Sequence, residues 1–151
     1  WRPADSEVNI VDGRRVRLDH IGIAVDSLDE GESFWRLLGL IPSGDDEVNP
    51  EQGVNIRFLE SASDSEPPRL ELLEPTGSDT PVGRFIDRRG VGVQQLAFEV
   101  EDLSGLLVEL KQAGIQLIGD VPAAGAAGTR IAFVHPKSTG GVLVELLEKL
   151  G

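Results

Sequence analysis

The sequence contains no cysteine and no methionine, and it has no apolar run long enough for a membrane-spanning helix. The absence of cysteine excludes disulfides, a thiolate nucleophile and any Cys-based zinc site. It also fits a reducing compartment, so we expect a cytoplasmic protein, or one in an organelle matrix if a targeting segment has been removed. Because even an initiator methionine is missing, we interpret the chain as trimmed, processed or part of a longer one.

Positive charge is also scarce in this chain. It has 14 lysines and arginines against 26 acidic residues, which gives a formal net charge of −12, and most of the positive residues are arginines. Phosphate backbones bind to basic surfaces, so we expect neither nucleic acid nor a membrane as a partner. With 151 residues, of which 40% are apolar, the chain is long enough for one soluble globular domain with its own core.

An internal repeat is the main positive feature of the sequence. A shift of 75 residues aligns the two halves without a gap, and the tetrapeptide ELLE recurs at 71–74 and 145–148. The aligned pairs include His20 with Gln95, Leu28 with Leu103 and Gly39 with Gly114. In each half a strand pattern leads into a helix pattern. A glycine then follows the predicted helix, at the position where a residue with left-handed backbone conformation usually ends a helix.

This repeat predicts an α+β fold with two β-α-β-β-β modules, at about 18–76 and 93–149, in a single domain at 18–151. An arm at 1–17, with an extra strand at 8–11, precedes the domain. The first module is expected to have a strand at 18–25, a helix at 28–38 and strands at 44–48, 53–60 and 69–74. The second is expected to have a strand at 93–100, a helix at 103–113 and strands at 115–120, 130–135 and 142–148. A linking helix at 82–89, a polar turn at 61–68 and a flexible loop at 122–128 complete the prediction.

Strand alternation predicts which side chains of the two repeat-related strands share a face. His20 should share one face with Gly22 and Ala24, and Gln95 should share one with Ala97 and Glu99. The large apolar residues then lie on the opposite face, under the helices. Small residues beside a polar one leave space, so we expect the polar face to border a site.

Four polar residues amid apolar neighbours occupy corresponding places in the two halves: His20, Glu71, Gln95 and Glu145. Two carboxylates, an imidazole and an amide oxygen can together bind a divalent cation. A buried pair of carboxylates would otherwise repel each other, and a doubly charged cation removes that repulsion.

Several stretches of the sequence resemble the methylmalonyl-CoA epimerase family of the vicinal oxygen chelate superfamily, to which glyoxalase I also belongs. The matching stretches are DHIGIAV, NPEQGV, LELLEP, GVQQLAFEVEDL, GIQLIGDVP and IAFVHPKSTGGVLVEL. They extend from about residue 18 to residue 147. The last stretch is the most specific one, whereas DHIGIAV alone would indicate only the superfamily.

The resemblance implies the vicinal oxygen chelate fold, a cupped and mostly antiparallel sheet around a metal site. It implies an isomerase that interconverts the C2 epimers of methylmalonyl-CoA, or a related acyl-CoA, by proton abstraction next to the thioester, in a homodimer. The implied ligands of a divalent Co, Mn, Mg, Ni or Zn ion are His20, Glu71, Gln95 and Glu145. Glu145 and Glu51 are the implied bases, and Lys137, Ser138 and Gln52 are predicted to bind substrate.

The sequence departs from the family pattern at two functional positions. The family usually has two histidines where this chain has Gln94 and Gln95, so Gln95 either binds the metal through its oxygen or marks a three-ligand or inactive site. Some members of the family carry a glutamate at the position that Ile56 occupies in this chain. The side chain of Ile56 cannot act as a base. This second departure makes Glu51 the preferred second base, although it could also be only a solvated loop residue.

Four alternatives remain open at this point. His20 could be an ordinary core histidine, and the arginines at 84, 88 and 89 could be a solvated helix face or could receive the phosphates of coenzyme A. The activity could be that of another enzyme of the superfamily, such as a glyoxalase-type lyase. Finally, the protein could be a metal-free small-molecule binder that kept the fold and lost the chemistry.

Overall fold

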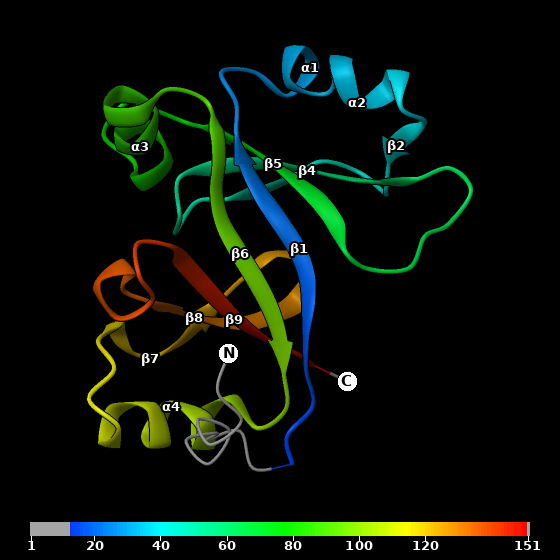
Figure 1. The fold of residues 1–151 in the computed structure, drawn as a ribbon. Helices are drawn as coiled ribbons and strands as arrows, with labels where there is room; N and C mark the ends of the chain where they lie inside the picture. Colours follow the sequence, from blue (N-terminus) through cyan, green and yellow to red (C-terminus); the bar gives the residue numbers. More distant parts are fainter. Residues whose placement is uncertain (1–12, 151) are drawn as a thin grey trace.

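A computed structural model describes residues 13–150, and the predicted strand at 8–11 lies outside this range. Figure 1 shows the two modules one above the other, joined by two long central strands. The elements of the first module are β1 (Val16–Ala24), α1 (Leu28–Gly31), α2 (Ser33–Leu37), β2 (Leu40–Pro42), β3 (Glu47–Asn49), β4 (Val54–Ser61) and β5 (Arg69–Pro75). The linking helix is α3 (Pro81–Arg89). The elements of the second module are β6 (Gly92–Val100), α4 (Leu103–Gln112), β7 (Leu117–Ala124), η2 (Ala126–Gly128), β8 (Thr129–Val134), η3 (Pro136–Ser138) and β9 (Leu143–Lys149).

All strands of the described range belong to one sheet with the order β2-β4-β5-β1-β6-β9-β8-β7, and β3 pairs with β4. The pairs β1–β5 and β6–β9 are parallel and the other neighbours are antiparallel. The antiparallel pair β1–β6 joins the two modules at the centre of the sheet and sets Gly22 opposite Gln95. The predicted α+β class with paired modules and a mostly antiparallel sheet is therefore confirmed.

Helices α1 and α4 cover the outer side of the sheet, as the strand alternation predicts. Ile23 and Val25 of the first module pack in one apolar cluster with Leu28 of α1. In the second module Val100 packs with Leu103 of α4, and several of these side chains are almost fully buried. Burying one such side chain contributes about 1.5–3 kcal/mol, so these two clusters hold each helix against its half of the sheet.

The predicted helix ends at glycine are confirmed in both modules. Gly39 has φ +90° and Gly114 has φ +83°, the left-handed region that glycine enters without a steric cost. The starts of α1 and α3 are capped by side chains, since Ser27 Oγ accepts a hydrogen bond from Glu30 N at 3.1 Å and Thr80 Oγ1 accepts one from Gly83 N at 3.1 Å.

The single helix predicted at 28–38 is wrong, because the structure has two short helices, α1 and α2, with Glu32 between them. Arg57 of β4 holds this junction, and its Nη1 lies 2.8 Å from Glu32 Oε1 and 2.9 Å from Asp29 Oδ1. The same guanidinium binds both carboxylate oxygens of Asp46, each at 2.8 Å. A residue 25 positions away thus ties the helical segment to the sheet.

Two further local predictions differ from the structure. The strand predicted at 44–48 is replaced by two short ones, β2 and β3, which pair with different parts of β4. The loop predicted at 122–128 begins as the last part of β7 and continues as the short 3₁₀ turn η2.

No helix in the described range is long and apolar enough to cross a membrane.

Candidate active site

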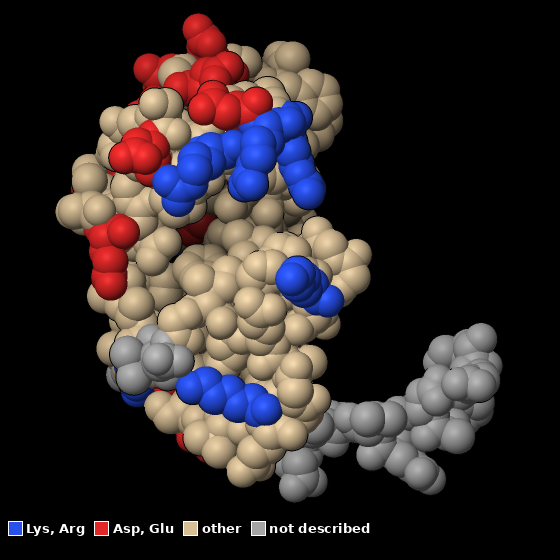
Figure 2. Space-filling view, turned by 90° about the vertical axis from the view of Figure 1, so that its left-hand side faces the viewer, with Lys and Arg blue, Asp and Glu red and all other residues tan. Residues whose placement is uncertain are grey.

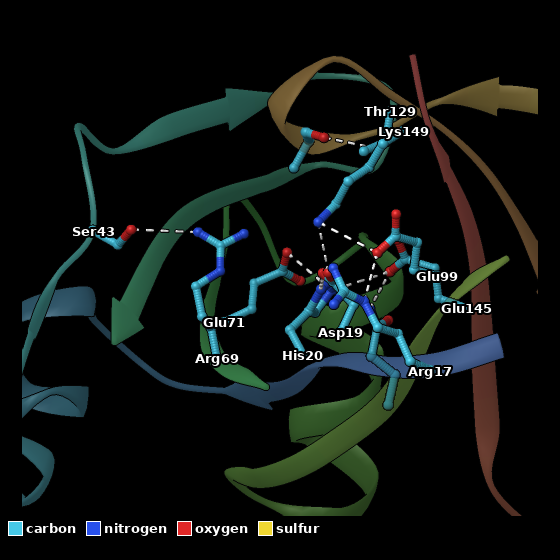
Figure 3. Close-up of polar contacts among 12 residues, drawn as sticks. Arg17, Asp19, His20, Ser43, Arg69, Glu71, Glu99, Thr129, Glu145 and Lys149 are labelled. Carbon is cyan, nitrogen blue, oxygen red and sulfur yellow. Dashed lines mark hydrogen bonds and ion pairs between the residues drawn. The ribbon is translucent and has the colours of Figure 1, made fainter. Parts of the chain in front are cut away.

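Three of the predicted ligands meet on the concave side of the sheet. His20 comes from β1, Glu71 from β5 and Glu145 from β9, and one ligand atom of each lies within 4.8 Å of the others. His20 Nε2 is 3.3 Å from Glu71 Oε2 and 3.8 Å from Glu145 Oε1. All three side chains are buried. Figure 3 shows Glu71 beside His20, with Glu145 on the far side of the imidazole.

Asp19 orients the imidazole from behind, and the sequence reasoning missed this residue. Its Oδ2 lies 2.7 Å from His20 Nδ1, and its Oδ1 lies 3.0 Å from the Nζ of Lys149. Regular alternation would place consecutive residues on opposite faces, but a register irregularity between Leu18 and His20 leaves both Asp19 and His20 buried. The only sequence signal for Asp19 was its place immediately before His20 in DHIGIAV.

The electrostatics of the cluster depend on close oppositely charged groups. Burial alone would lower the pKa of His20, but the Asp19 carboxylate bonded to its Nδ1 and the nearby carboxylates of Glu145 and Glu71 raise that pKa to about 11. Burial raises the pKa of Glu71, and the nearby His20 opposes this effect. For Asp19 burial would raise the pKa, yet hydrogen bonds from His20 and Lys149 hold it well below its usual range. The cluster is therefore built to hold positive charge at its centre.

The donor set fits a divalent cation. His20 Nε2 is a buried atom with no hydrogen-bond partner in the described range, and it faces the carboxylates of Glu71 and Glu145. Because Nδ1 is already engaged by Asp19, Nε2 is the nitrogen left for a metal, which is the usual arrangement for a histidine ligand. Two carboxylates and a neutral imidazole balance the charge of a doubly charged ion.

Gln95 lies beside this cluster and contacts it through its amide nitrogen. Its Nε2 donates a hydrogen bond to Glu145 Oε1 at 2.5 Å, and the residue is 5% exposed. A half-turn of the amide group exchanges nitrogen and oxygen, so the carbonyl oxygen could occupy the same position. Gly22 makes room for it, since a Cβ there would lie 2.6 Å from Gln95 Cγ. Ligation by Gln95 stays a prediction.

A small pocket of about 150 Å³ opens above the cluster. Its walls are mostly apolar and its polar lining comes from the cluster and from amide side chains. The lining residues include Val54, Ile56, Leu73, Val82, Ile131, Phe133, Asn49, Gln52, Glu71, Gln95 and Glu145. We call this cavity the acyl pocket, because only a small and partly apolar group fits it. Gln52, one of the predicted substrate-binding residues, lies on its wall.

The other predicted residues lie farther from the cluster. Glu51 is exposed in the turn between β3 and β4 and borders a neighbouring cavity, which shares Asn49 and Ile56 with the acyl pocket. Lys137 is exposed on η3, and Ser138 Oγ accepts a hydrogen bond from Gln116 N at 2.9 Å. Neither of these two residues lines the acyl pocket. The roles predicted for Glu51, Lys137 and Ser138 therefore stay predictions.

Comparisons with known proteins agree with this geometry. A sequence model of the Glyoxalase/Bleomycin resistance protein/Dioxygenase superfamily matches residues 19–133. An uncharacterized Bacillus subtilis protein, YqjC, is 43% identical over 89% of this chain and 94% of its own length. The mitochondrial methylmalonyl-CoA epimerase of Mus musculus is 37% identical over 86% of this chain and 71% of its own length. A structure of methylmalonyl-CoA epimerase in complex with methylmalonyl-CoA and NH4+ matches with a TM-score of 0.82 and 38% identity, over 90% of this chain and 96% of that one. The chain belongs to the Glyoxalase/Bleomycin resistance protein/Dioxygenase superfamily and, within it, to the methylmalonyl-CoA epimerases.

Proposed function

We propose that this chain is a metal-dependent isomerase that interconverts (2R)- and (2S)-methylmalonyl-CoA. The observation that carries the proposal is the buried cluster of His20, Glu71 and Glu145 at the base of a small acyl pocket. The relatives named as epimerases and the solved complex with methylmalonyl-CoA support the same substrate class. The cytoplasmic location that the composition favours stays a prediction.

His20, Glu71 and Glu145 would hold the cation, and Gln95 is the fourth candidate ligand. A divalent cation held there would supply positive charge that stabilises the negative charge developing on the thioester oxygen. Asp19 fixes the imidazole through its Nδ1 hydrogen bond, so the ligand geometry is set before substrate enters. The apolar walls exclude water, which strengthens every charge interaction inside the pocket.

Epimerisation needs one group to remove the C2 proton and another to return a proton on the opposite face. Glu145 lines the acyl pocket and is our candidate for one face. Glu51 is our candidate for the other, and it reaches the substrate if the turn between β3 and β4 folds over the wall that its cavity shares with the acyl pocket. Ile56, which lies on that wall, has no group that could act instead.

Solvent exchange at C2 of methylmalonyl-CoA is the experiment that tests this function. The protein loaded with Co²⁺ or Mn²⁺ should incorporate deuterium from D₂O at C2, and Glu51→Gln should lower the rate of epimerisation by roughly 10²–10⁴-fold. Glu66→Gln, at an exposed position in the turn between β4 and β5, is the matched control and should keep the parental rate. A Glu51→Gln variant that epimerises methylmalonyl-CoA as fast as the parent would show that Glu51 is not one of the two bases.

The same assay separates the alternatives. A protein that binds the metals but exchanges no C2 proton, and instead turns over a glutathione hemithioacetal, would be a glyoxalase-type lyase. A protein that binds no divalent ion in calorimetry and shows no turnover would be a binding protein that kept the fold. Calorimetric titration with each of Co²⁺, Mn²⁺, Mg²⁺, Ni²⁺ and Zn²⁺ would then rank these metals by their affinity for the protein.

We also propose that the protein is a homodimer that uses the surface of α2 and β2. Phe34, Leu37, Leu38 and Ile41 are exposed on this surface, and β2 ends the described sheet with a free edge. Contiguous apolar side chains beside a free strand edge are typical of an interaction surface. Light scattering should give twice the mass of the chain for the parent, and Leu37→Glu should shift the protein toward the monomer. A monomeric parent would overturn this assembly.

A further inference from the structure

Two cationic side chains approach the candidate metal cluster from a second cavity. The lining of the acyl pocket contains no lysine or arginine among the described residues. Figure 2 shows a hollow beside α3 with acidic side-chain atoms at its bottom and a band of Lys and Arg side chains above it. The second cavity, of about 300 Å³, borders His20 and Glu145, and Arg69 and Lys149 line it. We call it the rear cavity, and it shares only Glu145 and Ala126 with the acyl pocket.

Lys149 contacts the cluster through Asp19. Its Nζ lies 3.0 Å from Asp19 Oδ1, and the other oxygen of that carboxylate, Oδ2, lies 2.7 Å from His20 Nδ1. Figure 3 shows the three side chains linked in this order. In the described range Asp19 Oδ1 has no other polar partner. The carboxylate is therefore held between two groups, one at each oxygen.

Asp19 depends on these partners because it is almost fully buried, with only 2% of its surface exposed. A buried carboxylate is costly unless hydrogen-bonding or oppositely charged groups face it. Without Lys149, Oδ1 would lose its only partner, and a turn of the carboxylate toward solvent would break the hydrogen bond with His20. A histidine ligand keeps its ring orientation when its other nitrogen is held, and it binds metal more weakly when that contact is lost.

The position of Lys149 is itself set by two strands. It lies on β9, on the same face as Glu145 four residues earlier, and both side chains line the rear cavity. Its Nζ lies 3.6 Å from Glu99 Oε1 of β6, and Arg17 Nε donates a hydrogen bond to that oxygen at 2.9 Å. The Lys149 side chain is 44% exposed, so its ammonium group reaches Asp19 while its other side stays in water.

We propose that Lys149 is a positioning residue of the metal site. It holds the Asp19 carboxylate against His20 Nδ1 and so keeps Nε2 directed at Glu71 and Glu145, although Lys149 does not line the acyl pocket. The inference rests on the proposed function for the bound ion. It predicts an effect opposite in sign to a direct charge effect. A positive charge near a cation repels it, so charge alone would make the protein without Lys149 bind metal more tightly.

The metal affinity of metal-stripped protein, measured by calorimetric titration with Mn²⁺, tests the inference. Lys149→Met removes the charge and should raise the Kd by about fivefold, because the ion pair is partly exposed. Lys149→Arg keeps the charge and should restore most of the affinity. Asp19→Asn should raise the Kd by roughly 10–100-fold, and Lys149→Met added to it should weaken binding no further. The absorption spectrum of bound Co²⁺ should also change in Lys149→Met, because it reports ligand geometry.

Lys111→Met, at an exposed position of α4, is the matched control and should keep the parental Kd and spectrum. A Lys149→Met variant that binds Mn²⁺ as tightly as the parent, or more tightly, would overturn the inference. An equal loss of affinity in Lys149→Arg would do the same, because the inference requires the charge. So would a further fivefold loss when Lys149→Met is added to Asp19→Asn, because Lys149 would then act without Asp19.

A parent that binds no divalent ion would overturn the proposed function, and proton NMR of the metal-free protein then decides the positioning role. The hydrogen bond to Asp19 should give the His20 Nδ1–H a protected downfield resonance, which Asp19→Ala should abolish. Loss of this resonance in Lys149→Met would support the positioning role, and its retention there would overturn it.

Discussion

At the scale of single residues, we predict that Gln95 decides which metals the site prefers. With Gln95 as a ligand, the donor set has one nitrogen and three oxygen donors, which suits Mg²⁺ and Mn²⁺ better than late transition metals. Gln95→His should therefore tighten Co²⁺ binding relative to Mn²⁺, because imidazole favours Co²⁺. Calorimetric titration of metal-stripped protein measures both affinities. His20→Ala removes the only nitrogen donor and should weaken both metals, and unchanged Co²⁺ affinity in Gln95→His would mean that residue 95 does not face the metal.

Gly22 supports the same corner of the site by having no side chain. A Cβ at this position would lie 2.6 Å from Gln95 Cγ and 3.2 Å from Leu73 Cδ1, so the Gln95 side chain would have to leave its present position. Gly22→Ala should lower the free energy of unfolding by about 1–3 kcal/mol, the usual cost of overpacking. Urea denaturation measures this, with Gly77→Ala as control because nothing lies within 4 Å of its added Cβ. Equal losses in the two variants would contradict the packing argument.

Sequence reasoning could find His20, Glu71 and Glu145 because the repeat and the resemblance both mark these polar positions in apolar strands. It could not find Asp19, since strict alternation places that residue on the opposite face from His20. The register irregularity that brings Asp19 behind the imidazole depends on how β1 pairs with β6. Strand pairing of this kind is a long-range property that no local pattern reports.

At the scale of elements, Arg57 acts as a clamp between the helical segment and the sheet. It contacts Asp29, Glu32 and Asp46, which come from α1, the α1–α2 junction and the loop before β3. The break of the helix predicted at 28–38 could not be predicted, because the groups that stabilise it are far apart in the sequence. The ends of α2 and α4, by contrast, were predictable from Gly39 and Gly114, which act locally.

The clamp predicts a dependence of stability on pH. Its hydrogen bonds from Arg57 lower the pKa of Asp46 below the ordinary value of 3.8. A carboxyl whose pKa is lowered in the folded state stabilises that state fully above the unfolded pKa, and this contribution is lost as pH falls through the folded pKa. Asp46→Asn should thus be less stable than the parent at neutral pH, and the difference should shrink below about pH 4.

Urea denaturation at several pH values checks this expectation. Asp45→Asn is the matched control, because Asp45 makes no ion pair in the described range and its replacement should show no such dependence. A difference between the parent and Asp46→Asn that stayed constant from neutral to acid pH would show that the charge of Asp46 is not what the clamp uses.

At the scale of the whole molecule, the proposed metal site joins the two modules. His20 and Glu71 come from the first module, whereas Gln95 and Glu145 come from the second. A cation bound only by the folded chain stabilises it by about 2.7 kcal/mol at a hundredfold excess over its dissociation constant. Thermal unfolding should therefore shift upward when Mn²⁺ is added to metal-stripped protein. His20→Ala should lose most of that shift, and an equal shift in the variant would place the bound ion elsewhere.

The central pairing of β1 with β6 also has an evolutionary consequence. Each half of the chain supplies one corner of the site at a corresponding place, with His20 in one half and Gln95 in the other. In an assembly of two identical half-length chains, a mutation at this place would change both corners at once. With both halves on one polypeptide, a codon change alters the residue at only one of the two corresponding positions. Position 95 can therefore carry an amide while position 20 carries a histidine.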